Sequence, residues 1–341
     1  MNDFQKRVLI YSILVIFLIG AFLKSPYYKP EKISDFYVKM GIWENDKLEF
    51  YDLARCHYYI ALLFNPKSAW AYNALGNTYY NQTGGYYISD ELTRQGYEKA
   101  ISDFTKAISL ARNYPAAYTN RGDCYRFLGE YDKALEDYEL ALKYDSKNKR
   151  GLYGLSIIYG SKGYKQYNKA IKVLQKLVEF YPEYQDAYFG LGWNYDNIGN
   201  YKYSIENYEK VVELNPDRID AWINLSYTAE MGLRDYEKAI YYADKALELN
   251  ENSLYANSNK GYALVQLKRY DEAMKYIEKQ LFINKEHSRA YFQRGQVKLA
   301  KNDKQGAKED FERALELEKQ ASFDDTEKII GMIETFLKQC K

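Results

Sequence analysis

The sequence predicts an all-α fold, a solenoid of about eight stacked helix-turn-helix repeats that follows one N-terminal transmembrane helix. Three observations lead to this class. Small residues recur about every 34 positions along most of the 341 residues, prolines recur between the periodic blocks, and residues 8–23 carry no charge. A fixed period of roughly 20 to 50 residues is the signature of a repeat array.

The first predicted element is the apolar segment 8–23, which reads VLIYSILVIFLIGAFL and follows a short tail, residues 1–7. As a helix it extends roughly 24 Å, less than the ~30 Å hydrocarbon core but at the upper limit for a signal peptide. No clean small-x-small cleavage site follows it. An uncleaved transmembrane anchor is therefore favoured, and a cleaved signal peptide stays the alternative.

The orientation of this segment is ambiguous because cations stand on both sides. Lys6 and Arg7 precede it, whereas Lys24, Lys29 and further lysines follow. Positive charge is retained on the cytoplasmic side, so the two flanks compete. The short leading tail favours an exported, extracytoplasmic array, and a cytoplasmic-facing array is the alternative. Residues 24–33 contain two prolines and are predicted to form a linker.

The repeat is defined by two series of small residues that keep the same spacing. In the first helices they are Gly41, Gly76, Gly122, Ser156, Gly192, Ser226, Gly261 and Gly295; in the second helices they are Ala54, Ala100, Ala134, Ala170, Ser204, Ala239, Ala273 and Ala307. Apolar residues three or four positions apart share one face of a helix, so each unit should fold as a hairpin of amphipathic helices. Prolines such as Pro182 and Pro216 separate the units.

The clearest unit, PAAYTNRGDCYRFLGEYDKALEDYELALKYDSKN at 115–148, resembles the tetratricopeptide repeat (TPR). The resemblance implies a right-handed superhelix whose first helices line a concave groove for partner peptides. The predicted repeats lie near 34–68, 69–114, 115–148, 149–184, 185–218, 219–253, 254–287 and 288–321, which together form an array over 34–321. Apolar residues at helical spacing predict a capping helix over 325–340.

The second repeat contains about 12 extra residues between its helices, around 83–95. Loop insertions cost little free energy of folding, so a neutral elaboration is the simpler interpretation. A binding loop that presents Tyr86 and Tyr87 is the alternative.

Composition excludes several classes of function. Lys and Arg total 48 against 47 for Asp and Glu, so the chain has no summed field for nucleic acid. The three cysteines are widely spaced, and His57 and His287 are predicted to be surface helix residues, so no metal site is expected. Phosphate-binding, zinc-protease and nucleophile-elbow motifs do not occur. We expect no enzyme and no cofactor.

The groove of the predicted superhelix should contain amides and aromatic rings. Asn120, Asn224 and Asn259 stand two positions before a first-helix small residue, in a row that resembles the asparagine ladder of the O-GlcNAc transferase superhelix, and an amide can bind an extended backbone. Aromatic residues flank this row in the middle repeats and are either an apolar trough or buried packing residues. The peptide-binding candidates are Asn73, Asn77, Asn120, Arg150, Tyr153, Phe189, Trp193, Asn224, Tyr227, Asn259 and Tyr262.

A carboxylate clamp, as in some TPR co-chaperones, is a narrower hypothesis for the same groove. The matching positions hold Asn73, Asn77, Asn120, Arg150 and Gly154. Only Asn77 and Asn120 match outright, and cations are missing at positions 73 and 154. The sequence therefore predicts a scaffold or adaptor that binds extended or helical segments of other proteins at a membrane. A structural spacer that associates with itself, without a peptide ligand, is the alternative.

Overall fold

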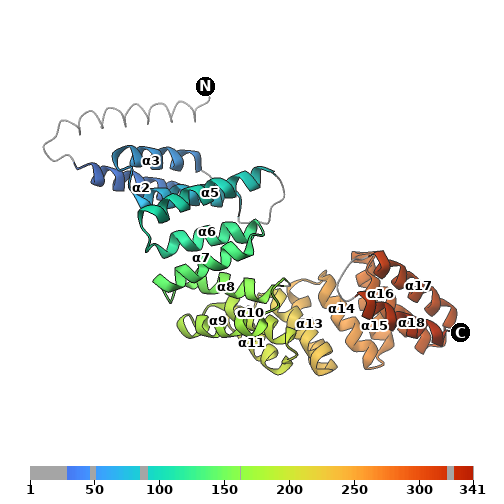
Figure 1. Ribbon diagram of the computed structural model, residues 1–341. Helices are drawn as coiled ribbons and strands as arrows, with labels where there is room; N and C mark the ends of the chain where they lie inside the picture. Colours follow the sequence, from blue (N-terminus) through green and yellow to red (C-terminus); the bar gives the residue numbers. More distant parts are fainter. Residues whose placement is uncertain (1–28, 47–50, 85–90, 162, 321–325, 341) are drawn as a thin grey trace. The chain divides into compact units, whose positions relative to one another are not determined.

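The computed structural model describes residues 29–46, 51–84, 91–161, 163–320 and 326–340. These residues form 17 α-helices and one π-helix, and they contain no strand. The predicted all-α class is confirmed for this part of the chain. The helices group into two compact units, residues 1–164 and 165–341, each of which is described by itself (Figure 1).

The first unit contains three hairpins and one further helix. Its helices are α2 (Pro30–Asp46), α3 (Tyr51–Phe64), α4 (Ala69–Gln82), α5 (Glu91–Leu110), α6 (Pro115–Phe127), α7 (Tyr131–Tyr144) and α8 (Lys149–Gly160). Within it α2 packs against α3, α4 against α5 and α6 against α7 (Figure 1). α2 begins at Pro30, inside the predicted linker, because proline is well suited to the first turn of a helix.

The second unit continues the pattern of hairpins. Its helices are α9 (Tyr167–Phe180), α10 (Gln185–Asn197), α11 (Tyr201–Leu214), α12 (Ile219–Tyr227), the π-helix η1 (Thr228–Leu233), α13 (Tyr236–Leu249), α14 (Leu254–Gln266), α15 (Tyr270–Ile283), α16 (Ser288–Ala300), α17 (Lys304–Gln320) and α18 (Thr326–Gln339). From α4 onward, each first helix begins at the residue where the sequence places the start of a repeat. The repeat predicted at 149–184 is divided, with α8 in one unit and α9 in the other.

Large aromatic rings of the second helices pack against the small residues of the first helices. A Cβ atom on Gly192 would lie 2.7 Å from the ring of Tyr208, whose side chain is fully buried. Gly122 faces Tyr138 and Gly295 faces Phe311 in the same way. Glycine therefore lets the two helices of a hairpin approach closely enough to enclose an aromatic ring.

The turns within the hairpins share a left-handed residue two positions before the second helix. Gly129 and Gly199 occupy this position with φ of 78° and 75°. Elsewhere the position is filled by residues with a side chain, namely Lys165, Arg234, Lys268 and Asn302. The left-handed conformation is less favourable than the right-handed one for residues other than glycine, so the turns that use such residues are locally strained.

The π-helix η1 accommodates one extra residue in the sixth repeat. Ile219 and Tyr236, which begin the two helices of this repeat, are 17 positions apart, whereas Leu254 and Tyr270 in the next repeat are 16 apart. A π-helical turn has a wider hydrogen-bonding pattern and absorbs an inserted residue without breaking the helix. The first helix therefore remains continuous into the turn.

The last helix covers the end of the second unit. Ile333 of α18 is 1% exposed, and the ring of Phe336 lies 5.3 Å from that of Phe292 and 5.5 Å from that of Phe311. The apolar face predicted for 325–340 therefore packs on the last hairpin.

The anchor predicted at 8–23 lies outside the described residues, as do Tyr86 and Tyr87. Among the helices that the structure describes, none is long and apolar enough to cross a membrane.

The surface position predicted for His57 is wrong. Its ring is buried in α3 and stacks on Tyr37 at 5.8 Å, because the helix face that carries Ala54 and Tyr58 also includes His57.

Candidate functional site

In the first unit, the predicted amide positions form a hydrogen-bonded network across three first helices. Asn120 of α6 donates from Nδ2 to Oδ1 of Asn73 in α4 at 3.0 Å. Arg150 of α8 donates to Oδ1 of Asn120 at 2.8 Å and forms an ion pair with Asp123. Tyr138 also donates to Asp123, at 2.5 Å. The network therefore joins α4, α6 and α8.

These hydrogen bonds occupy the side-chain amides and the guanidinium that the sequence predicts to bind a partner peptide. Asn73 and Asn120 are only 6% and 4% exposed, whereas Asn77 is half-buried. The positive charge of Arg150 is compensated by Asp123, and a Cβ atom on Gly154 would overlap the ring of Tyr138. The structure thus brings Asn73, Asn120 and Arg150 together. The polar atoms of the two asparagines are used inside the protein, whereas the Arg150 side chain forms its bonds while remaining 52% exposed.

The second unit repeats this arrangement, except that its asparagine donates to a backbone carbonyl and not to another asparagine side chain. Asn259 of α14 donates to the carbonyl of Ile223 at 3.2 Å, and Arg289 of α16 donates to Asn259 at 3.4 Å. Arg289 also pairs with Glu230 of η1. Burial raises the pKa of Glu230 to about 7, although the adjacent guanidinium of Arg289 acts in the opposite direction. Asn224 is half-buried.

The predicted aromatic residues divide between packing and exposure. Tyr153 of the first unit is half-buried. In the second unit Phe189 lies edge-on against Tyr208 at 5.4 Å and beneath the guanidinium of Arg218 at 4.4 Å, which is a packing position. Trp193 and Tyr227, by contrast, are 38% and 48% exposed.

One of these exposed residues, Tyr227, borders an apolar cavity of about 240 Å³ in the second unit. It is lined by Tyr227, Met231, Tyr262, Ser288, Arg289, Phe292, Glu318, Ile329, Met332 and Ile333. The guanidinium of Arg289 lies 5.1 Å from the centre of the Tyr262 ring. First helices, the π-helix and α18 all contribute side chains, so this cavity joins two predicted residues to neighbours that the sequence did not single out.

Met231, Phe292, Ile329 and Met332 were missed as site residues. The helical spacing of Ile329 and Met332 predicts an apolar face for the last helix, but it does not show that the face also borders a cavity. Met231 lies within the π-helix that accommodates the extra residue of the sixth repeat, so a comparison at a fixed period of 34 does not assign its position. The sequence does indicate the extra residue, because Ile219 and Tyr236 are 17 positions apart whereas the corresponding residues of the next repeat are 16 apart.

The repeats also match a known family directly. Four sequence profiles, each described as tetratricopeptide repeat, match residues 115–148, 151–184, 185–218, 227–285 and 288–320. Together these segments cover more than half of the chain. The chain belongs to the tetratricopeptide-repeat family. Proteins of this family generally mediate protein–protein interactions and are typically not enzymes.

Individual TPR relatives share part of the chain. The Hsp70-Hsp90 organizing protein of Triticum aestivum is 33% identical over 130 residues, which are 38% of this chain and 20% of that protein. The DnaJ homolog subfamily C member 7 homolog of Dictyostelium discoideum is 22% identical over 333 residues, covering 79% of this chain and 59% of that protein. This TPR chain therefore spans less than two thirds of the length of each relative.

Solved structures support the TPR fold. A tetratricopeptide repeat protein from Parabacteroides merdae is 20% identical and superimposes with a TM-score of 0.53, covering 78% of this chain and 98% of that one. At this identity the likeness establishes the fold alone.

Proposed function

We propose that this TPR protein is a scaffold or adaptor that binds a segment of a partner protein on the first-helix face of its second unit. The observation that carries the proposal is the apolar cavity between Tyr227, Tyr262 and α18. Single exposed apolar residues are ordinary on a protein surface, but a contiguous group around a cavity marks a binding site.

The size and lining of the cavity favour an apolar side chain as the anchor. An apolar cavity of about 150 Å³ holds benzene, so about 240 Å³ accommodates an aliphatic or aromatic side chain of a partner. Tyr227, Met231 and Met332 are 48%, 48% and 40% exposed, and they would be covered by the rest of the bound segment. Methionine and tyrosine side chains adapt to different apolar surfaces and are enriched at protein interfaces.

Polar groups at the rim would orient the bound segment. Arg289 lies on the ring of Tyr262, and Glu318 accepts a hydrogen bond from Ser288. Arg289 is already paired with Glu230, so these rim groups favour a partner whose anchor is flanked by polar residues that hydrogen-bond to them. In this proposal Trp193 extends the binding face, whereas Asn73, Asn120 and Asn259 support the array from within.

We further propose that residues 8–23 tether the array to a membrane, with the array on the extracytoplasmic side. Sixteen consecutive residues without a charge support the tether, and the short tail with Lys6 and Arg7 supports this orientation. Alkaline extraction of membranes tests the tether, and protease digestion of intact cells tests the side. Release of the chain by alkali, or protection of the array from external protease, would contradict these two parts of the proposal.

A photo-crosslinking experiment tests partner binding. The full-length chain is produced in the cells from which it comes, with p-benzoylphenylalanine in place of Tyr227, or of Tyr255 as a control. Tyr255 is 67% exposed on the same unit but does not line the cavity. We expect a discrete product of higher mass at Tyr227, and its loss when Met332→Asp is added. Equal labelling at both positions would contradict the proposal, and a product of twice the chain mass would favour the self-associating spacer.

A further inference from the structure

The N-terminal part of α5 borders a polar pocket in the first unit. α5 has 20 residues, whereas the second helices α7, α9, α11, α13 and α15 each have 14. Tyr97 holds the position in α5 that Tyr131 holds at the start of α7. The residues from Glu91 to Gly96 are therefore an added N-terminal extension of the helix.

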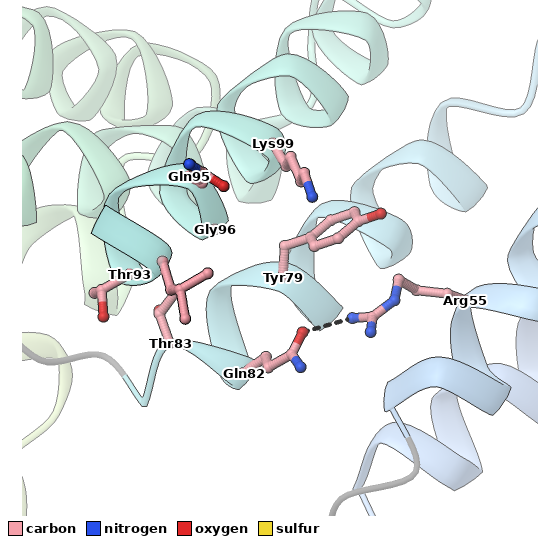
Figure 2. A pocket seen from close by; sticks show the side chains of 9 residues that line it. Arg55, Tyr79, Gln82, Thr83, Thr93, Gln95, Gly96 and Lys99 are labelled. Atoms are coloured by element: carbon pink, nitrogen blue, oxygen red, sulfur yellow. Dashed lines mark hydrogen bonds between the residues drawn. The ribbon is translucent and has the colours of Figure 1, made fainter. Parts of the chain in front are cut away.

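This extension lies against the end of α4, as Figure 2 shows. A Cβ atom on Gly96 would lie 2.5 Å from the methyl carbon of Thr83, so glycine permits the close approach. The hydroxyl of Thr83 in turn donates to the carbonyl of Tyr80 and fixes the end of α4. Between the extension, α4 and α3 lies a pocket of about 520 Å³, which we call the α5 pocket. It is lined by Arg55, Tyr79, Gln82, Thr83, Leu92, Thr93, Gln95, Gly96 and Lys99.

Two cations of the α5 pocket share one aromatic ring. The guanidinium of Arg55 lies 4.8 Å from the centre of the Tyr79 ring, and Nζ of Lys99 lies 5.6 Å from it. Arg55 is also held by Gln82, which accepts a hydrogen bond from Nη1 at 3.0 Å (Figure 2). With its side chain only 11% exposed, Arg55 is oriented before any ligand arrives.

The charges of the α5 pocket are poorly compensated. No carboxylate is among its described lining residues, and Lys99 has no ion-pair partner within the described part of the chain. Arg55 pairs with Asp52, but the side chain of Asp52 is 87% exposed and the two residues are three positions apart on one helix. An ion pair whose carboxylate is this exposed to solvent contributes little to stability. An anion that binds both cations can therefore replace Asp52 at little cost.

We propose that the α5 pocket binds a carboxylate side chain of an acidic segment of a partner protein. Charge complementarity with Arg55 and Lys99 supports a carboxylate, and the amide nitrogen of Gln82 adds a neutral donor, whereas the amide nitrogen of Gln95 already donates to Glu91 at 3.2 Å. Leu92, which is 78% exposed at the edge, offers an apolar contact to the residue beside the carboxylate. The pocket lies between the second helices α3 and α5 and the end of α4, so it is independent of the apolar cavity in the second unit.

Fluorescence anisotropy of the purified full-length chain with a fluorescein-labelled hexaglutamate peptide tests this site. Lys99→Met removes the charge and keeps the aliphatic stem, and Lys106→Met, at an exposed position further along α5, is the matched control. We expect saturable binding that Lys99→Met weakens at least five-fold and that Lys106→Met changes by less than two-fold. Equal weakening by both variants, or no saturable binding at millimolar protein, would overturn the proposal.

A second variant tests the contribution of Arg55 without removing it. Gln82→Glu places a carboxylate against the guanidinium and should weaken hexaglutamate binding to a similar extent, with an unchanged circular dichroism spectrum. Unweakened binding by a folded Gln82→Glu protein counts against the site. Inorganic phosphate and acetate are compared as competitors at equal ionic strength. Stronger competition by phosphate than by acetate would overturn the choice of a carboxylate and indicate a phosphorylated ligand.

Discussion

Arg289 of α16 pairs with Glu230 of the π-helix, which lies 59 residues earlier in the chain and two repeats away. The side chain of Glu230 is fully buried, and its Oε2 atom has no hydrogen-bond partner among the described residues. The guanidinium of Arg289 also contacts Asn259 and the ring of Tyr262. One side chain therefore connects three consecutive first helices of the second unit.

The Glu230 carboxyl should make stability depend on pH. Its pKa is about 7 in the folded protein against an ordinary value of 4.5, so the folded state keeps a proton that the unfolded state releases. The free energy of unfolding should therefore fall as pH rises from about 4.5 to about 7, by up to about 3 kcal/mol. Glu230→Gln should remove the Glu230 part of this pH dependence in urea unfolding followed by circular dichroism. Burial also raises the pKa of Asp103 to about 7 and that of Asp196 to about 6, so a smaller slope of the same sign should remain. An unchanged slope in Glu230→Gln, or an equal reduction in the exposed Glu251→Gln control, would contradict this assignment.

Arg150 should act on stability rather than on a peptide. Arg150→Met leaves Asp123 without its cation and removes a donor from Asn120, which should lower the free energy of unfolding by about 1–3 kcal/mol. The exposed Arg112→Met is the control and should change it by less than about 0.5 kcal/mol. Unchanged stability of Arg150→Met, together with loss of binding to a peptide with an acidic C-terminus, would instead support the carboxylate clamp.

The left-handed turn residues offer a matched pair of substitutions. Lys268 adopts φ of 59°, so Lys268→Gly should stabilise the second unit by about 1 kcal/mol. Gly129 has φ of 78° and open space around its missing Cβ, so Gly129→Ala should destabilise the first unit by about the same amount through the backbone alone. Thermal unfolding measures both. Gly163→Ala, at a glycine with no positive φ and no near neighbour, should show neither effect.

Tyr208 and Tyr227 separate packing from binding. Tyr208 is fully buried and Tyr227 is 48% exposed. Tyr208→Ala should cost about 3–5 kcal/mol, as large-to-small changes in cores do, whereas Tyr227→Ala should cost less than about 1 kcal/mol and keep the helical spectrum. Unfolding of Tyr227→Ala would show that this ring belongs to the core and would remove it from the proposed binding face.

The positions of the helices were predictable because each repeat marks itself locally. A small residue such as Gly192 and the ring of Tyr208 that it faces are 16 positions apart, and the same spacing returns at Gly122 and Tyr138. Such short-range periodicity fixes helix type and hairpin pairing. It gives no signal for the boundary between the two compact units, which falls after Tyr164 inside a repeat.

The candidate site was less predictable because its decisive contacts join distant residues. Register shows that Asn120 faces the neighbouring first helices, but only the structure shows that Asn73, 47 residues earlier, accepts its hydrogen bond. Exposure of Trp193 and burial of Phe189 likewise depend on neighbours in other helices, although both residues stand at groove positions in the sequence. The cavity depends on α18, whose distance from Tyr227 in the chain hides the contact from any periodic comparison.

The extra residue in η1 has a consequence for how the repeats are aligned with one another. Tyr227 corresponds to Trp193 without a gap, whereas Arg234 corresponds to Gly199 only across a gap of one residue. Because the π-helix absorbs the difference within six residues, the repeats on either side keep their own register. A repeat of this chain can therefore hold one extra residue without rotating the helices that follow it.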